Sequence, residues 1–398
     1  MAGIDFGCNI DGTCPATKVQ VPLESLGGFD SAGQMKHFVK DDGMNVFRLP
    51  MSWQYITAAK PTGNLDKINW GNFDKLVQTC LQTGAYCMLD LHNFARYDGK
   101  IIGQGGLSDD VFAGIWDKIA SFYAKEEKII FGLMNEPHDL DVKTWAKSCQ
   151  AAVTAIRKAG AASQMILLPG TDFASAGTLV SSGSAEALAA ITNPDGSKDN
   201  LVLDIHKYLD INNSGSHKEC TTNNVEAFRT AADWLRSNKR LGFVSETGAS
   251  MDPSCMSKFC EQNKEIAKND DVFVGFVGWA AGGFDSTYDL TLTPSKSGDT
   301  WTDNKLMKQC IIGPFSRASK AVSASTTTIS SSTTTSSTPG SSTTAQKPTS
   351  APSSAAPSRT QKAQNNNATP NKDSGAVRTG ASTIGYIFAC TMFASLFL

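Results

Sequence analysis

A regular alternation of apolar runs and amphipathic stretches most constrains what this chain can fold into. Runs of strand character occur at Asn45–Pro50, Tyr86–His92, Ile129–Glu136, Met165–Pro169, Leu201–Tyr208, Leu241–Glu246 and Val272–Trp279. Stretches with helical spacing of apolar residues separate many of them, at Phe73–Thr83, Val111–Tyr123, Val142–Ala159, Val225–Leu235 and Lys258–Ala267. Strands that alternate with helices predict a parallel sheet whose strands are joined by crossover helices.

The number of these units favours an α/β fold of the (β/α)8 TIM-barrel type. About 315 residues with seven or eight strand–helix units suit that barrel better than an open sheet. An eighth strand is expected at the very start, where only Ala2–Phe6 is available, so the first strand is expected to be truncated. A doubly wound sheet is the alternative. No G-x-G-x-x-G motif follows an early strand, and Gly103-Gln104-Gly105-Gly106 lacks the strand–turn–helix context of a nucleotide loop.

Composition changes near Arg317 and predicts three segments. Residues 1–316 have the mixed composition of a globular domain. Residues 317–380 are rich in Ser, Thr and Pro, which predicts a disordered, O-glycosylated linker. Residues 381–398 form a hydrophobic tail that follows a polar spacer and the small residues Ser374-Gly375-Ala376. This is the pattern of a glycosylphosphatidylinositol (GPI) attachment signal. Such a signal implies export, so we expect a signal peptide that is missing from this sequence.

Charge and cysteine content narrow the class of function. The net charge is -2, with 36 basic and 38 acidic residues and no basic block, which disfavours nucleic-acid binding. Ten cysteines, several at short spacings (Cys8/Cys14, Cys80/Cys87, Cys255/Cys260), indicate disulfides and an oxidising compartment. None of these spacings is C-x-x-C and no histidine lies nearby at ligand spacing, so we expect no zinc site.

Polar residues stand at or just after the ends of most strand-like runs. They are Arg48, His92 with Asn93, Asn135 with Glu136, His206 with Tyr208, Glu246 and Trp279. In a barrel the carboxyl ends of all strands meet on the face where active sites are built. Each residue also has an ordinary interpretation: a structural ion pair for Arg48, satisfied core histidines, simple packing for Trp279, and a solvated charge for Glu136.

Two carboxylates that face one cleft suit the hydrolysis of a glycosidic bond. One must be protonated to release the leaving-group oxygen, and the other must be ionised to attack the sugar or to activate water. An adjacent Arg48 would keep one carboxylate anionic, while the neighbouring negative charge would raise the pKa of the other. Trp279 offers a flat apolar face to a sugar ring. The reaction needs no cofactor and no metal.

The ordered motifs resemble those of secreted fungal endo-β-1,4-glucanases of glycoside hydrolase family 5, over about residues 3–312. They are Asp5-Phe6-Gly7-Cys8, Phe47-Arg48-Leu49-Pro50, Asp90-Leu91-His92-Asn93, Met134-Asn135-Glu136-Pro137-His138, Asp204-Ile205-His206-Lys207-Tyr208, Glu246-Thr247-Gly248 and Gly278-Trp279-Ala280-Ala281-Gly282.

The resemblance implies a (β/α)8 barrel and a retaining mechanism with carboxyl groups about 5–5.5 Å apart. Glu136 then resembles the acid/base and Glu246 the nucleophile. The implied substrate-binding residues are Arg48, His92, Asn93, Asn135, His206, Tyr208 and Trp279. The implied disulfides are Cys8–Cys14, Cys80–Cys87, Cys220–Cys255 and Cys260–Cys310, which leave Cys149 as a buried thiol and Cys390 in the tail.

The expected partner is a β-glucan polysaccharide or oligosaccharide, bound by a monomer at or outside the cell surface, with membrane attachment only through a lipid anchor. One alternative is the same chemistry on mannan, mixed-linkage glucan or xyloglucan. Another is a non-catalytic protein that binds cell-wall glycans. The family has several more residues before Ala2 that form the first strand, so we also expect low stability for a polypeptide of this sequence alone.

Overall fold

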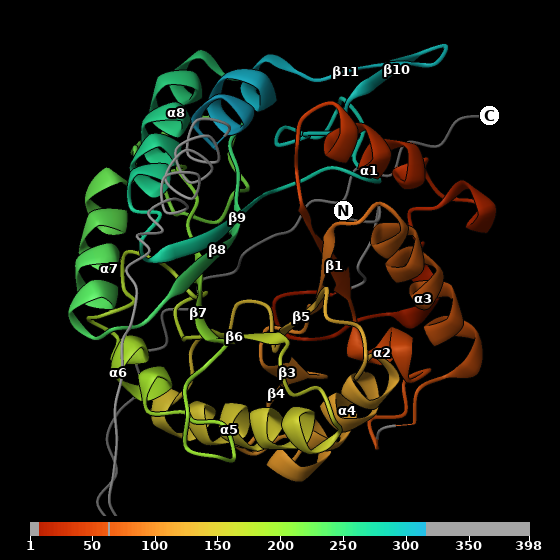
Figure 1. The fold of residues 1–398 in the computed structure, drawn as a ribbon, viewed down its shortest axis with the longest axis vertical. Helices are drawn as coiled ribbons and strands as arrows, with labels where there is room; N and C mark the ends of the chain where they lie inside the picture. The colour runs from red at the N-terminus through yellow and green to blue at the C-terminus, as the bar shows by residue number, and fades with distance from the viewer. Residues whose placement is uncertain (1–7, 63, 316–398) are drawn as a thin grey trace, which may run out of the picture. The chain divides into compact units, whose positions relative to one another are not determined.

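The computed structural model describes residues 8–62 and 64–315 (Figure 1). The truncated first strand expected at Ala2–Phe6, the linker at 317–380 and the tail at 381–398 lie outside these residues. Within the described ranges, no helix is both long enough and apolar enough to cross a membrane.

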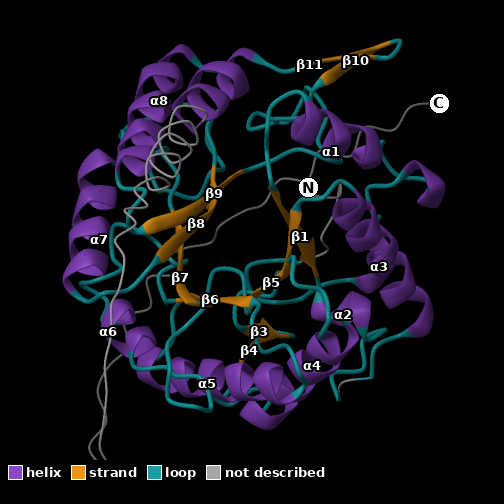
Figure 2. Ribbon diagram, in the orientation of Figure 1, coloured by secondary structure: helices purple, strands orange, loops and turns teal. Residues whose placement is uncertain are grey.

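A seven-stranded parallel sheet curls into a nearly closed barrel, with helices around its outside (Figure 2). The strands follow the order β1-β2-β5-β6-β7-β8-β9. Their bounds are β1 Val46–Met51, β2 Tyr86–Leu91, β5 Ile129–Gly132, β6 Met165–Pro169, β7 Leu201–His206, β8 Gly242–Thr247 and β9 Phe273–Gly278. All seven strands expected from the apolar runs are present, and the (β/α)8 fold class is confirmed.

Side-chain caps fix the starts of the outer helices. Asp66, Ser108, Asp141 and Asp252 each accept a hydrogen bond from a backbone N–H of the first turn, which satisfies a donor that the helix itself leaves free. The helices are α1 Ser31–Lys40, α2 Trp53–Ile56, α3 Lys67–Gln82, α4 Asp109–Phe122, α5 Val142–Lys158, α6 Ser184–Ala189, α7 Val225–Ser237 and α8 Pro253–Lys268. Two short hairpins, β3 Arg96–Tyr97 with β4 Lys100–Ile101 and β10 Ser295–Ser297 with β11 Thr300–Thr302, lie outside the barrel sheet. A π-helical turn at Met307–Ile312 follows.

The barrel interior is apolar at one end and polar at the other. An inner apolar cluster takes one residue from each of five adjacent strands: Met88, Ile130, Leu167, Val202 and Phe243. A larger cluster fills the layer between the strands and the helices. The strands are therefore covered on both faces, which explains why the sequence shows continuous apolar runs instead of alternation. The polar strand ends lie beyond the inner cluster.

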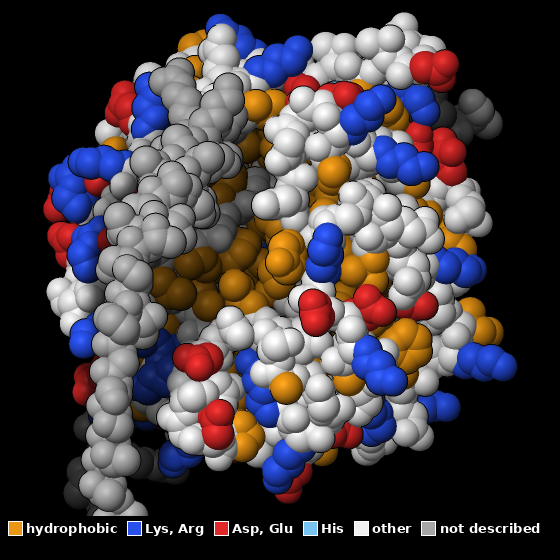
Figure 3. Space-filling view, in the orientation of Figure 1, with side chains coloured by type: hydrophobic (Ala, Val, Ile, Leu, Met, Phe, Trp, Pro, Cys, Tyr) orange, Lys and Arg blue, Asp and Glu red, His pale blue; other side chains and the backbone are white. Residues whose placement is uncertain are grey.

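The described sheet has its two edges at β1 and β9. A cavity of about 550 Å³ runs along this seam, lined by Phe47, Phe276, Leu292 and Ile311 among others. Apolar atoms are visible in the central hollow of Figure 3, and acidic and basic side chains are interspersed on the surrounding surface. Two hydrogen bonds join α1 to the segment after β9. The Gln34 side chain donates to the Gly282 carbonyl at 3.0 Å and accepts from the Gly282 N–H at 2.9 Å.

Four disulfides connect the elements as the family resemblance implies: Cys8–Cys14, Cys80–Cys87, Cys220–Cys255 and Cys260–Cys310. The second links the end of α3 to β2, the third joins the loop after β7 to α8, and the fourth joins α8 to the π-helical turn. Cys149 is a free, buried thiol within α5, as expected.

Candidate active site

Glu136 lies in the loop that follows β5 and not in the strand that the sequence predicts. Strand β5 ends at Gly132, and the chain then turns while the Asn135 N–H donates to the Leu91 carbonyl at 2.8 Å. The predicted strand to Glu136 is thus too long. The backbone of Glu136 has φ of 44°, in the left-handed region that non-glycine residues seldom occupy. Such strained positions gather at functional sites, because the surrounding structure must hold them there.

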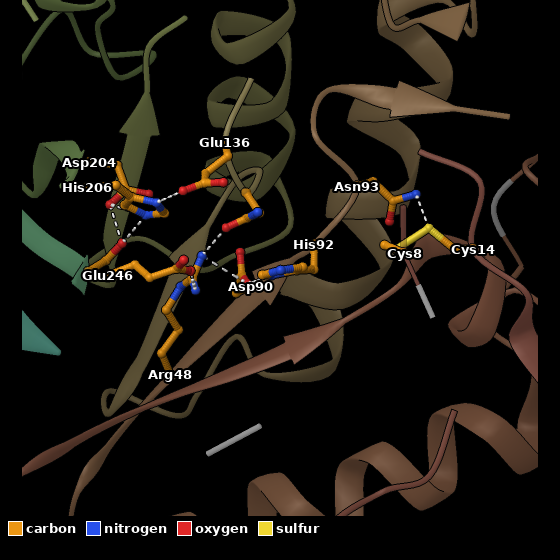
Figure 4. A network of polar contacts seen from close by, with 12 residues as sticks. Cys8, Cys14, Arg48, Asp90, His92, Asn93, Glu136, Asp204, His206 and Glu246 are labelled. Carbon is orange, nitrogen blue, oxygen red and sulfur yellow. Dashed lines mark hydrogen bonds and ion pairs between the residues drawn. A yellow bond between two sulfur atoms is a disulfide. The ribbon is translucent and has the colours of Figure 1, made fainter. Parts of the chain in front are cut away.

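Glu246 stands near the end of β8, and both of its carboxylate oxygens have partners (Figure 4). Arg48 Nη1 on β1 donates to Oε2, and the Tyr208 hydroxyl donates to Oε1 at 2.7 Å. Burial alone would raise the pKa of Glu246, but Arg48, and after it the two nearby histidines, hold that pKa well below its ordinary value. Glu246 is therefore an anion over the working pH range of most hydrolases.

The surroundings of Glu136 raise the pKa of its carboxyl group, whereas those of Glu246 lower it. Its Oε1 lies 2.9 Å from His206 Nδ1, and its side chain retains 16% exposure, against 6% for Glu246. Burial, followed by the negative charge of Glu246, raises the pKa of Glu136, and His206 offsets this only in part. The environments thus push the pKa values of the two carboxyl groups apart, which assigns one as an acid and the other as a base or nucleophile.

Two further carboxylates belong to this network and were missed from the sequence. Asp90 Oδ2 lies 3.0 Å from Arg48 Nη2 and 2.7 Å from His92 Nδ1. Asp204 Oδ1 accepts from Ser245 Oγ at 2.5 Å, and the same hydroxyl lies 2.9 Å from His206 Nε2. Each aspartate stands in a strand, two residues before its histidine. The repeated Asp-x-His pattern is the signal that could have revealed them.

Asn135 and Trp279 border the carboxylate pair. Arg48 Nη2 donates to Asn135 Oδ1 at 2.7 Å, which fixes the orientation of the amide. Its Nδ2 donor then has no hydrogen-bond partner among the described residues. The Trp279 ring stacks against His92 with centroids 5.7 Å apart, and its Nε1 donates to the Tyr288 hydroxyl at 2.9 Å. An aromatic face and an uncommitted amide donor thus accompany the two carboxylates.

Asn93 is a correction to the set predicted from the sequence. Its side chain is completely buried and lies apart from the carboxylates, beside the Cys8–Cys14 disulfide (Figure 4). Its amide donates to Gln54 Oε1 at 2.8 Å and to Cys14 Sγ at 3.3 Å, and its Oδ1 accepts from the Trp53 N–H at 2.7 Å. With both ends of the amide committed inside the protein, Asn93 has no access to a substrate. It anchors the loop instead.

The remaining predicted residues do come together. One connected group at the carboxyl ends of the strands contains Arg48, His92, Asn135, Glu136, His206, Tyr208, Glu246 and Trp279. A carboxylate oxygen of Glu136, a ring nitrogen of His206 and a carboxylate oxygen of Glu246 lie within 4.8 Å of one another. This upper limit on the distance between the nearest oxygens is compatible with the carboxyl separation of about 5–5.5 Å in retaining glycosidases.

Comparisons with known proteins agree with this arrangement. The family model of the cellulases, glycosyl hydrolase family 5, matches residues 13–283. Endoglucanase EG-II of Hypocrea jecorina is 52% identical over 316 residues, which cover 78% of this chain and 76% of that protein. Endoglucanase 1 of Saitozyma flava is 43% identical over 306 residues, which cover 75% of this chain and 85% of that protein. The crystal structure of Cel5A (EG2) from Hypocrea jecorina superposes with a TM-score of 0.76 at 52% identity and covers 78% of this chain and 95% of that one. The chain therefore belongs to the cellulase family, glycosyl hydrolase family 5.

Proposed function

We propose that this chain is a retaining endo-β-1,4-glucanase in which Glu136 is the acid/base and Glu246 is the nucleophile. The observation that carries the proposal is the pair of carboxyl groups with oppositely shifted pKa values and oxygens within 4.8 Å of each other. The similar proteins are named endoglucanases, which favours a β-1,4-glucan as the substrate.

In the first step, Glu246 attacks the anomeric carbon and the bond to the leaving-group oxygen breaks. Glu136 gives its proton to that oxygen, so the departing sugar leaves as an alcohol and Glu136 becomes a carboxylate. The pKa directions provide both starting states, a protonated Glu136 and an ionised Glu246. Arg48 and Tyr208 hold the carboxylate of Glu246 in one orientation, which fixes the direction of attack.

In the second step, Glu136 acts as the base. Once Glu246 is esterified its negative charge is gone, so the interaction that raises the pKa of Glu136 is removed and its ionised form becomes easier to hold. Water gives a proton to Glu136 and attacks the anomeric carbon from the side that the leaving group vacated. The ester bond to Glu246 breaks, and both residues return to their starting states with the anomeric configuration retained.

The groups around the carboxylates suit a sugar substrate. The Asn135 amide can donate through Nδ2 to a sugar hydroxyl next to the anomeric carbon, a bond that strengthens as positive charge develops. Trp279 offers a ring for stacking below the sugar that is cleaved. His92 is held by Asp90 at 2.7 Å and lies against Trp279, so it bounds the same subsite.

Two substitutions with a shared control test these roles. Glu136→Gln and Glu246→Gln should each abolish the release of reducing sugar from carboxymethyl cellulose, whereas Glu226→Gln, at a side chain that is 80% exposed, should retain it. In a dinitrophenyl cellobioside the leaving group is dinitrophenolate, which departs without protonation. Glu136→Gln should therefore still release a burst of dinitrophenolate, and Glu246→Gln should release none. Activity on cellulose that survives both substitutions would refute the assignment, and it would also leave the non-catalytic glycan-binding alternative unsupported.

The substrate and the stereochemistry need separate measurements. The subsite loops set the choice among cellulose, mixed-linkage glucan, xyloglucan and mannan, and a panel of defined oligosaccharides read by product chromatography distinguishes them. We expect cleavage of internal β-1,4-glucosyl bonds. Proton NMR of the first product should show the β-anomer. Initial release of the α-anomer would contradict the retaining mechanism.

The four disulfides support folding in an oxidising compartment, and we propose that the enzyme works as a monomer outside the cell. The Ser/Thr-rich segment and the hydrophobic tail further support a GPI anchor at the cell surface. Phosphatidylinositol-specific phospholipase C should release the full-length protein from cells as a soluble species. Protein that stays bound after this treatment, or that appears entirely in the medium without it, would count against the anchor.

A further inference from the structure

A second cluster of ionisable side chains lies away from the catalytic residues. His37 belongs to the last turn of α1, Asp42 follows that helix, and Asp303 follows β11. His37 Nε2 lies 3.0 Å from Asp303 Oδ1 and 3.5 Å from Asp42 Oδ2. One ligand-type atom from each of the three side chains falls within 4.8 Å of the others. The cluster joins parts of the chain that are 266 residues apart.

Asp42 is the member that points to a bound ion. Its side chain is only 9% exposed, and its Oδ2 has no hydrogen-bond partner among the described residues, although it faces His37 Nε2. A buried carboxylate oxygen without a donor is costly, because the solvation that it loses is not replaced. Asp303 is also buried and adds a second negative charge beside it. His37 and, more weakly, Lys308 offset only part of the effect of burial and of the negative charge of Asp303, so the pKa of Asp42 is raised to about 6.

The orientation of His37 is that of a metal ligand. Its Nδ1 lies 2.7 Å from Asp41 Oδ2 and its Nε2 lies 3.0 Å from Asp303 Oδ1, so both ring nitrogens face carboxylates, and a cation that takes the place of the Nε2 proton would meet Nε2 and the oxygens of Asp42 and Asp303. A histidine ligand commonly gives its second N–H to a carboxylate in this way. Without a proton or a cation between them, the Nε2 lone pair and the two carboxylates would repel one another. The Trp301 ring lies nearly parallel to His37, with centroids 6.2 Å apart.

The distances suit a small divalent cation. Bonds of about 2.0–2.2 Å from one metal to nitrogen and oxygen ligands, at octahedral to tetrahedral angles, place the ligand atoms roughly 3.0–3.5 Å apart. The separations from His37 Nε2 are 3.0 and 3.5 Å. One imidazole with two carboxylates fits Zn²⁺, Mn²⁺ or Co²⁺. Mg²⁺ and Ca²⁺ prefer oxygen ligands only.

We propose that His37, Asp42 and Asp303 bind a divalent first-row transition cation that stabilises the fold, with Asp41 as the positioning residue for His37. The cation fastens α1 to the segment after β11, next to the Lys296–Asp30 ion pair at 2.7 Å that joins β10 to the start of α1. It takes no part in the hydrolytic reaction, for which two carboxylates suffice.

Metal titration of the full-length protein, stripped with a chelator, tests the site. We expect about one equivalent of Co²⁺ to bind with a visible d–d absorption. Zn²⁺ or Mn²⁺ at a hundred times its Kd should raise the Tm by roughly 4 °C, while Mg²⁺ and Ca²⁺ should leave it unchanged. Asp303→Asn should lose both the absorption and the rise in Tm. Glu136→Gln/Glu246→Gln should keep both, which separates this site from the catalytic carboxylates.

Asp42→Asn gives the sharpest result, because its effect changes sign with the metal. Without metal this variant should melt no lower than the wild type, since it removes a buried carboxylate oxygen that has no donor and is repelled by Asp303. With Zn²⁺ present it should melt about 4 °C below the wild type, because it no longer responds to the cation. Three results would overturn the proposal. The metal-dependent rise in Tm could survive in Asp42→Asn, it could disappear in the catalytic double variant, or Ca²⁺ could produce the same rise. So would a wild type that gains no stability from Zn²⁺ or Mn²⁺.

Discussion

Replacement of Arg48 by methionine tests the electrostatics of the catalytic site directly. Arg48 is 2% exposed, and its guanidinium contacts Glu246, Asp90 at 3.0 Å and Asn135 at 2.7 Å. Methionine keeps much of the aliphatic volume and removes the charge, so two buried carboxylates lose their guanidinium partner. Breaking a buried ion pair from one side costs about 3–5 kcal/mol. We expect Arg48→Met to lower the free energy of unfolding at pH 7 by that amount.

The size of the change in melting temperature follows from the size of the domain. About 300 residues give an unfolding entropy of roughly 0.6 kcal/mol per kelvin, so the Tm should fall by roughly 5–8 °C. The loss should depend on pH. In the wild type the pKa of Glu246 is lowered by folding, so its contribution to stability is present above the unfolded pKa and is lost as the pH falls through the folded one. In the variant the largest charge that lowers this pKa is gone, so burial is opposed only by the two histidines and Tyr208, and ionisation of Glu246 stabilises the fold much less as the pH rises. The gap between the two proteins should therefore narrow as the pH falls from 7 to 4, and it should close only near the folded pKa of Glu246, about 2.

Thermal unfolding of the full-length wild type and variant between pH 4 and pH 7 measures this gap. Arg236→Met is a matched control, because Arg236 also pairs with two aspartates, Asp233 and Asp271, but is 44% exposed. An exposed pair contributes about 0–1 kcal/mol, so the control should change little at any pH in this range. Equal losses in the two variants, or a gap for Arg48→Met that stays constant with pH, would refute the electrostatic account of Glu246.

Three further predictions concern catalysis. The alkaline limb of kcat/KM should reflect Glu136 and lie above the ordinary range of a glutamate, because burial and Glu246 raise its pKa; a limb below pH 5 would contradict this. Tyr208→Phe removes a 2.7 Å hydrogen bond to the nucleophile and should lower kcat about 10- to 100-fold with a smaller change in KM, as measured on cellopentaose. Trp279→Ala should raise KM for the same substrate about tenfold or more by removing the stacking face, and an unchanged KM would show that the ring does not contact the sugar.

The sequence predicted the strands well because both of their faces are buried. Runs such as Ile129–Phe131 contain only apolar residues, since helices cover one side and the inner cluster the other. Helix α1 gave no comparable signal. Its buried face includes the polar residues Ser31, Gln34 and His37, which interrupt the apolar stripe. Helices α2 and α6 are only 4 and 6 residues long, too short for a helical period to be recognised.

The catalytic residues could be predicted because, in a barrel, residues at the carboxyl ends of the strands all lie on the same face. That rule fails for Asn93, which follows His92 directly but points to the loop of the first disulfide instead of the cleft. It also overlooks Asp90 and Asp204, which stand inside the strands and act through the two histidines. The His37–Asp303 contact spans 266 residues between segments without a shared motif, so only the folded chain brings it into view.

Closure of the barrel and the chemistry of the nucleophile are physically linked. Arg48 belongs to β1 and Glu246 to β8, with the edge strand β9 next to β8, so their ion pair reaches across the seam between the two edges of the described sheet. The seam itself is held by side chains of α1: Gln34 on Gly282, Asp30 on Lys296, and His37 beside Asp303. We expect a substitution that weakens these contacts to lengthen the Arg48–Glu246 pair. Because the attraction between the two charges falls with distance, the pKa of Glu246 then rises before the domain unfolds.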